Sequence, residues 1–129
     1  METIYYYCTS LTSVDIPNSV TTIAKGAFVE CENLASVTIG NAVTTIGNTA
    51  FKNCFSLKSM AIPNSVESIG NDAFYNCHSM TRLTIGNSVT SIGVGAFINC
   101  SSLTSVTIPN SVTSIGQSAF LHREKERYS

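Results

Sequence analysis

The sequence of 129 residues is poor in charge and in large anchoring side chains. It contains no tryptophan and two histidines, 12% of its residues are charged, and its net charge is −1. Such a chain lacks the basic surface that attracts nucleic acids or anionic membranes. No apolar run approaches the length of about 18 residues that a membrane-spanning helix needs. The sequence therefore predicts neither a nucleic-acid partner nor membrane insertion.

The N-terminus lacks a basic segment followed by an apolar one, so the chain contains no recognisable signal peptide. The cellular location stays open. The chain is either intracellular or a piece of a longer cell-surface or secreted protein.

Patterns of catalytic and metal-binding residues are also missing. His78 and His122 are the only histidines, and the eight carboxylates are scattered along the chain. The glycines do not form a phosphate-binding motif. None of the five cysteines belongs to a Cys-x-x-Cys pair, which is the usual spacing of zinc ligands. The sequence predicts no enzymatic activity, no cofactor and no metal ion.

The chain does contain a unit that recurs every 23 residues. A fixed period of this length is typical of a solenoid, in which each unit must stack on its neighbours to bury its apolar side chains. The clearest columns are Leu11, Leu34, Leu57, Met80, Leu103; Ile16, Ile39, Ile62, Ile85, Ile108; Phe28, Phe51, Phe74, Phe97, Phe120; and Cys8, Cys31, Cys54, Cys77, Cys100.

The periodicity changes within each unit, and residues 102–120 illustrate it. Residues 104–108 alternate and are rich in β-branched side chains, which predicts a first strand. Asn110 lies at a corner, since asparagine tolerates unusual backbone angles and bonds its own backbone. Residues 112–115 form a second short extended piece. After Gly116, we expect residues 117–120 to begin a helical turn, because in complete copies Ala50, Phe51 and Cys54 share one face at helical spacing.

The full pattern is Leu-x-x-Val-x-Ile-(Pro/Gly)-Asn-x-Val-x-x-Ile-Gly-x-x-Ala-Phe-x-x-Cys, and it covers residues 4–120. It resembles the BspA-like class of leucine-rich repeats. The resemblance implies a leucine-rich-repeat solenoid of the α/β horseshoe type, with a curved parallel sheet, short second strands and short helical turns. It also implies similarity to surface adhesins and host-interaction proteins of bacteria and protozoan parasites, and therefore a binding function without a named ligand.

We expect one solenoid domain over residues 1–129. Residues 1–10 form a partial first repeat, residues 11–120 form five repeats of which the last is incomplete, and residues 121–129 form a charged tail. The tail is either solvated or a polar cap on the last coil.

The cysteine column predicts buried free thiols. Stacked coils bring successive Cα atoms to about 4.8 Å, within the range of a disulfide. The Cβ atoms of in-register residues stay about as far apart, however, beyond the usual ~3.8 Å. A disulfide ladder is the less favoured alternative.

The outward side of the first strands is the candidate binding face, since curved solenoids commonly bind through such surfaces. Most of its side chains are small hydroxyls, and it lacks tryptophan and tyrosine, so we expect weak affinity. The alternative is a solvated face whose residues vary without function. The candidate concave-face residues are Asp15, Ser36, Thr38, Lys58, Arg82, Thr84, Ser105 and Thr107.

The function predicted from these features is that of a non-enzymatic protein–protein interaction module, used for adhesion or surface display. One alternative is end-to-end self-assembly into homo-oligomers, with Tyr5, Tyr6 and Tyr7 as candidate end contacts; these tyrosines could instead simply cover the first coil. A minor alternative is binding to ice or another crystal surface. That alternative rests on a threonine column that Glu67 interrupts: Thr21, Thr44, Thr90 and Thr113.

Overall fold

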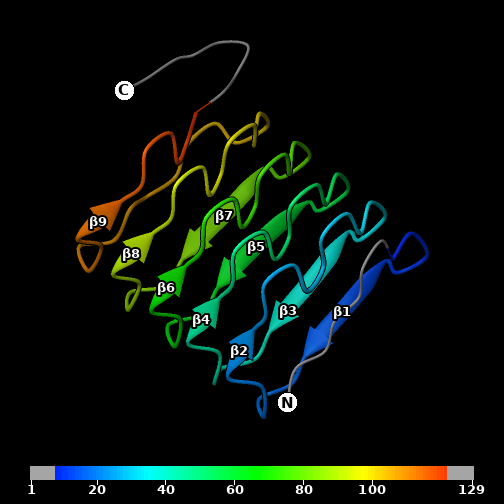
Figure 1. The fold of residues 1–129 in the computed structure, drawn as a ribbon, viewed down its shortest axis with the longest axis horizontal. Helices are drawn as coiled ribbons and strands as arrows, with labels where there is room; N and C mark the ends of the chain where they lie inside the picture. Colours follow the sequence, from blue (N-terminus) through cyan, green and yellow to red (C-terminus); the bar gives the residue numbers. More distant parts are fainter. Residues whose placement is uncertain (1–7, 122–129) are drawn as a thin grey trace.

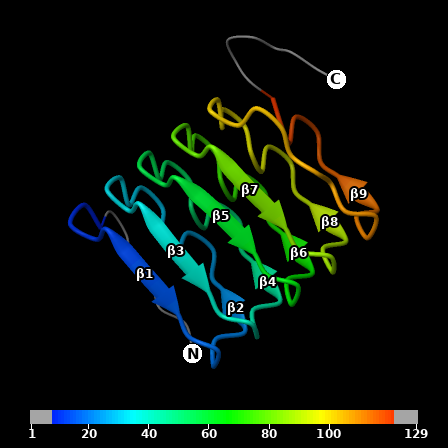
Figure 2. The ribbon, with the colours of Figure 1, turned by 180° about the vertical axis from the view of Figure 1, so that it is seen from behind.

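A computed structural model describes residues 8–121, which form a solenoid of coils stacked side by side (Figure 1, Figure 2). Each complete coil has a four-residue first strand followed by a two-residue second strand. The first strands are β1 (Ser13–Ile16), β3 (Ser36–Ile39), β5 (Ser59–Ile62) and β7 (Arg82–Ile85). The second strands are β2 (Thr22–Ile23), β4 (Thr45–Ile46), β6 (Ser68–Ile69), β8 (Ser91–Ile92) and β9 (Ser114–Ile115).

The strands pair in parallel, in the register that the repeat predicts. Ile16 lies opposite Ile39, and Ile23 lies opposite Ile46. The second strands form one continuous sheet in the order β2-β4-β6-β8-β9. The first strands instead form two separate pairs, β1–β3 and β5–β7. Between these pairs the Lys58 amide donates to the Ala35 carbonyl over 3.2 Å, so the coils stay in contact where the regular ladder is interrupted.

The strand expected over residues 104–108 is absent, so this part of the prediction is wrong. The following second strand, β9, forms as predicted. A position at the end of the described stack is not a sufficient reason, because β1 and β9 also pair on one side only and are strands. Val106 and Ile108 are only partly buried against the core.

The closing segment of each coil also differs from the expected helical turn. In the third coil the amides of Ala50, Lys52 and Cys54 bond three residues back, to Gly47, Thr49 and Phe51. The intervening amides bond forward to the next coil, as in Phe51 to Ala73 at 2.7 Å. Thr49 and Asn53 have left-handed φ values of 58° and 63°, which a continuing α-helix cannot accommodate. No helix among residues 8–121 is long and apolar enough to cross a membrane.

The corner asparagines act between coils rather than on their own backbone. The Asn18 side-chain oxygen accepts a hydrogen bond from the Asn41 amide over 2.9 Å, and Asn64 does the same for Asn87. The expected local hydrogen bond is therefore replaced by a link between coils. Each such asparagine helps to hold the next coil in register.

The core is a set of stacked columns, of which the phenylalanine column is the largest. The rings of Phe28, Phe51, Phe74, Phe97 and Phe120 stack with centroids 5.1 to 5.2 Å apart and interplanar angles of 3° to 8°. Phe51 and Phe74 are completely buried. The described part of the chain buries no charged or polar side chain in this core. Packing of apolar columns therefore holds one coil on the next.

Candidate functional site

The predicted binding face consists of the outward side chains of the first strands, and we call it the first-strand face. The pairing of β1 with β3 sets Asp15 beside Thr38, and that of β5 with β7 sets Ala61 beside Thr84. The structure leaves all eight predicted residues of this face exposed: Asp15, Ser36, Thr38, Lys58, Arg82, Thr84, Ser105 and Thr107.

Lys58 and Arg82 lie on neighbouring coils but are staggered by one residue. Lys58 directly precedes β5, and its carbonyl accepts a hydrogen bond from the Thr81 amide over 2.9 Å. Arg82 lies opposite Ser59 in the strand register. The two cationic residues are thus exposed on neighbouring coils, and their place in one binding face stays a prediction.

The other predicted residues of the first-strand face do not form one regular row along it. Ser105 and Thr107 are exposed, but the segment that carries them is not a strand. The regular strand pairing is interrupted between β3, which carries Ser36 and Thr38, and β5, although the Lys58 amide still donates to the Ala35 carbonyl. The candidate end contacts Tyr5, Tyr6 and Tyr7 lie outside the described residues.

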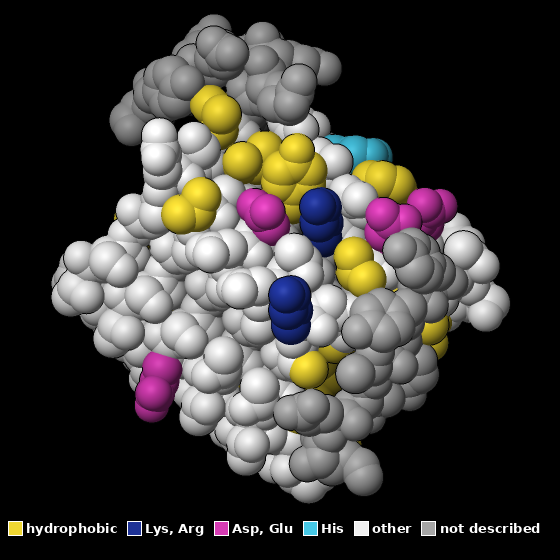
Figure 3. Space-filling view, viewed as in Figure 1, with side chains coloured by type: hydrophobic (Ala, Val, Ile, Leu, Met, Phe, Trp, Pro, Cys, Tyr) yellow, Lys and Arg dark blue, Asp and Glu magenta, His cyan; other side chains and the backbone are white. Residues whose placement is uncertain are grey.

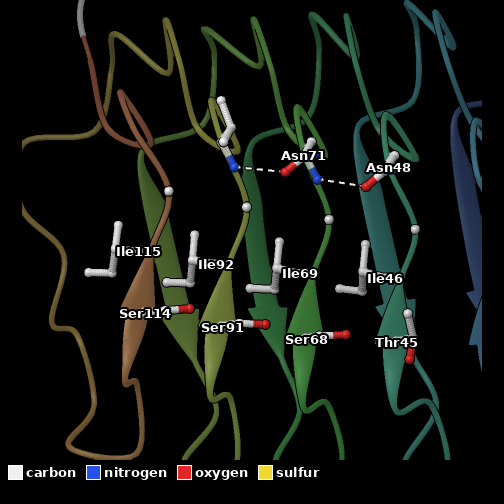
Figure 4. Close-up of a pocket in the computed structure, with 15 residues that line it drawn as sticks. Thr45, Ile46, Asn48, Ser68, Ile69, Asn71, Ser91, Ile92, Ser114 and Ile115 are labelled. Carbon is white, nitrogen blue, oxygen red and sulfur yellow. Dashed lines mark hydrogen bonds between the residues drawn. The ribbon is translucent and has the colours of Figure 1, made fainter.

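A second surface, which the sequence analysis did not identify, is a shallow groove across the second strands (Figure 4). It has a volume of about 570 Å³ and runs over β4, β6, β8 and β9. Its lining contains no charged residue: Thr45, Ile46, Gly47, Asn48, Ser68, Ile69, Gly70, Asn71, Ser91, Ile92, Gly93, Val94, Ser114, Ile115 and Gly116. A glycine follows each of these four strands in the lining, and a Cβ atom there would meet the backbone of the preceding coil, as at Gly93, where it would lie 2.5 Å from the Asn71 nitrogen.

Two asparagines form a ladder along this groove (Figure 4). The Asn48 side-chain oxygen accepts from the Asn71 amide, and the Asn71 side-chain oxygen accepts from the Val94 amide, both over 2.8 Å. Val94 ends the ladder because valine has no side-chain acceptor. Its side chain is 51% exposed, and Val94 and Ile115 are the two exposed large hydrophobic residues in the described part of the chain.

Most of the face seen in Figure 3 is neither hydrophobic nor charged. Its hydrophobic side chains and most of its charged ones lie in the upper and right parts, and an acidic side chain lies apart at the lower left. Two non-repetitive pairs lie on the surface of the closing segments. The Lys52 ammonium lies 5.2 Å from the centre of the Tyr75 ring, a cation–π contact. The rings of Phe55 and His78 stack with centroids 5.0 Å apart. These pairs break the repeat in the middle of the solenoid.

The cysteine column is largely buried, and burial keeps its thiols protonated. The five cysteines, all within the described residues, carry thiols rather than disulfides, and Cys8 alone is only half-buried. Burial raises the pKa of Cys54 and Cys100 from the ordinary 9.0 to about 12, because a thiolate would lose its hydration. No group of three or more His, Cys, Asp or Glu residues within 8–121 could hold a metal ion.

Comparison with known proteins identifies the repeat. The family profile described as "BspA type Leucine rich repeat region" matches residues 1–126 in six copies. The chain belongs to the BspA-type leucine-rich repeat family. No match was found among curated proteins.

Solved structures of this leucine-rich repeat type are similar over most of the chain. The leucine-rich repeat protein of T. pallidum is 32% identical, with a TM-score of 0.81 over 95% of this chain. A leucine-rich cell surface protein from Faecalibacterium prausnitzii is 41% identical, with a TM-score of 0.79 over 88% of this chain. The pneumococcal vaccine antigen PcpA is 28% identical, with a TM-score of 0.74 over 84% of this chain. The alignments span 63%, 32% and 27% of those three chains, less than two thirds of each.

Proposed function

We propose that this BspA-type solenoid is a non-enzymatic protein-interaction module that acts in adhesion or surface display through its first-strand face. The observation that carries the proposal is an exposed row of small side chains, most of them hydroxyls, interrupted by three charges. These charges are Asp15, Lys58 and Arg82. Small side chains leave the backbone accessible to a partner, and isolated charges orient that partner rather than add much affinity.

The relatives support the surface role by their descriptions. One is described as a cell surface protein and another as a vaccine antigen. Both share the coil geometry of this chain over more than four fifths of its length, 88% and 84%. A display role fits a fold whose stability comes from columns inside the coil, since the outward residues are then free to vary.

An adhesion assay with a matched control tests the proposal. Beads coated with the chain are allowed to settle on cultured epithelial cells, and retention under flow is counted. We expect Lys58→Glu with Arg82→Glu to reduce retention several-fold. The control variant, Lys25→Glu with Lys52→Glu, makes the same change of charge outside the first-strand face and should leave retention unchanged. Equal loss in both double variants, or no retention of the unmodified chain, contradicts the proposal.

Binding to ice or another crystal surface is the less supported alternative. The hydroxyls of Thr44 and Thr113 donate to the carbonyls of Thr21 and Thr90, over 3.3 and 3.2 Å, so they are already engaged by the backbone. Glu67 is exposed in the middle of the same column. A thermal-hysteresis measurement on the chain checks this alternative directly.

A further inference from the structure

The structure sets the two cationic residues of the first-strand face next to each other, and we call Lys58 and Arg82 the basic pair. Lys58 directly precedes β5, and Arg82 is the first residue of β7 and lies opposite Ser59. Figure 2 shows β5 and β7 side by side. An offset of one strand spacing and one residue puts the Cα atoms of the pair about 6 Å apart. Both side chains are exposed, so both can reach one segment of a partner.

The basic pair has no carboxylate partner among residues 8–121, where neither cation forms an ion pair. Asp15, the acidic residue of the first-strand face, lies on β1, two coils before Lys58. Spacings of about 4.8 Å per coil and about 3.3 Å per residue put its Cα atom roughly 14 Å from that of Lys58. This separation exceeds the Debye length of about 8 Å at physiological salt, so the charge of Asp15 is largely screened. The other described carboxylates lie outside the first strands: Glu30, Glu32, Glu67 and Asp72.

The side chains around the basic pair are small and leave room for a partner. Ser59, Ala61, Thr81 and Thr84 are all exposed on the same two coils. The Thr81 hydroxyl donates to the Lys58 carbonyl over 3.5 Å, so it lies against the backbone of the neighbouring coil. A partner's main chain can therefore come close to both cations without meeting a large side chain.

We propose that the basic pair binds an acidic segment of a protein partner, in which two carboxylates lie two residues apart on an extended chain. That spacing is roughly 6.6 Å, close to the separation of the pair. The Arg82 guanidinium would hold one carboxylate through two parallel hydrogen bonds, while the Lys58 ammonium attracts the other as a point charge. The inference rests on the proposed function, since it names the chemistry of the partner for the same face.

Two cations suit a pair of carboxylates better than a long polyanion. Sites for sulfated polysaccharides or nucleic acids draw on runs of basic residues. This chain has seven lysines and arginines in 129 residues, and its net charge is −1. Heparin, a sulfated polysaccharide, is therefore the competing probe in the test.

Direct binding to an immobilised synthetic peptide tests the inference with the full chain. The probe carries two glutamates separated by one glycine, and its control carries two glutamines in their place. Biolayer interferometry should show at least about tenfold tighter binding to the glutamate peptide, because hydrogen bonds to charged groups are the stronger ones. Raising the salt concentration should weaken this binding.

Substitutions in the basic pair test the roles of the two cations. Arg82→Gln should weaken binding to the glutamate peptide about tenfold, and Arg82→Lys should weaken it less, because lysine keeps the charge but loses the planar fork. Lys25→Gln with Lys52→Gln removes two cations elsewhere and should leave binding unchanged. Lys58→Glu with Arg82→Glu should instead bind a peptide with two lysines. Circular dichroism checks that each variant folds.

Equal binding to the glutamate and glutamine peptides overturns the inference, and so does binding to heparin without binding to the glutamate peptide. Adding excess glutamate peptide to the cell-retention assay separates this inference from the proposed function. If Lys58→Glu with Arg82→Glu abolishes retention but the peptide does not compete, the face binds cells and the acidic partner is wrong. If the peptide binds through the basic pair but the same double variant retains its hold on cells, adhesion through this face is wrong and the binding inference stands.

Discussion

The thiol of Cys77 donates a hydrogen bond to the backbone carbonyl oxygen of Phe51, 3.2 Å away in the preceding coil. The same bond joins Cys54 to Phe28 at 3.3 Å and Cys100 to Phe74 at 3.2 Å. Cysteine suits this position because it is small and apolar yet carries a weak donor. The cysteine and phenylalanine columns therefore stabilise one another at these three junctions between coils.

Thiol reactivity should report this burial. In the native protein Cys8, which is half-buried, should react with a thiol reagent, while the four buried cysteines should not. After unfolding in denaturant, all five should react. Titration with a chromogenic disulfide in the presence and absence of denaturant measures both states. Fast reaction of the folded chain at more than one site contradicts the buried-thiol arrangement.

Stability should decrease at alkaline pH because of the same thiols. Burial raises the pKa of Cys54 and Cys100 from 9.0 to about 12, so the unfolded state loses its thiol protons first. The stabilisation is fully present below pH 9.0, and it is lost as the pH rises from there toward about 12. Denaturant midpoints between pH 8 and about 11 test this linkage.

Replacing one buried thiol provides the control for the alkaline effect. Cys54→Ala should show a shallower decrease in unfolding free energy above pH 9.0 than the unmodified chain, whatever its stability at neutral pH. Identical slopes in the two proteins would assign the alkaline loss to other groups.

Removing an aromatic ring from the phenylalanine column should be strongly destabilising. Phe74 is 0% exposed and stacks on both neighbours, so Phe74→Ala should lower the unfolding free energy by about 3–5 kcal/mol. Phe55→Ala removes a half-buried ring that stacks only on His78 and should cost clearly less. Urea melts of both variants measure the difference. A loss below about 1 kcal/mol for Phe74→Ala contradicts the stacked core.

Asn76 combines a hydrogen-bond ladder with an unusual backbone angle, and two substitutions separate these effects. Its side chain donates to Asn53 over 3.0 Å and accepts from Asn99 over 2.9 Å, and its φ is 64°. Asn76→Gly loses the ladder but tolerates the backbone, so it should cost about 1 kcal/mol. Asn76→Ala adds left-handed strain and should cost about 1 kcal/mol more. Equal thermal stability of the two variants would exclude a contribution from strain.

The glycine column should not tolerate a side chain. A Cβ atom at Gly93 would lie 2.5 Å from the backbone nitrogen of Asn71. Gly93→Ala must therefore separate two coils, and we expect a loss of about 1–3 kcal/mol. Ser91→Ala, on the adjoining strand of the same groove, should change stability by less than about 0.5 kcal/mol. Melting curves of the two variants give the comparison.

The repeat period was enough to predict which residues meet, because a fixed spacing places each side chain against its equivalent in the next coil. The phenylalanine and cysteine columns and the second strands follow from it. The closing segment was mispredicted as helical because Ala50, Phe51 and Cys54 do share helical spacing. The left-handed angles of Thr49 and Asn53 arise from forward hydrogen bonds to the next coil. Those bonds depend on stacking, which no single repeat encodes.

The candidate sites were predicted less completely than the fold. Lys58 and Arg82 are both exposed, on neighbouring coils, but strand alternation does not place them on one side, because Lys58 precedes β5 and is one residue out of register with Arg82. Their role in binding stays a prediction. The break between β3 and β5 was not predictable, because the paired sequences differ little from those of the other coils. The groove was missed because its lining contains no charged residue that would mark it in the sequence.

Many hydrogen bonds between coils join residues one repeat apart, and this spacing has a mechanical consequence. The ladder bonds of Asn41, Asn71 and Thr90 all span 23 residues, so each coil is held by its immediate neighbours. A chain pulled from one end should therefore unfold one coil at a time. Each release of 23 residues lengthens the chain by roughly 75 Å, at ~3.4 Å per extended residue less the thickness of one coil. Under tension the solenoid would lengthen in uniform steps as successive coils unfold, and so act as an extensible tether.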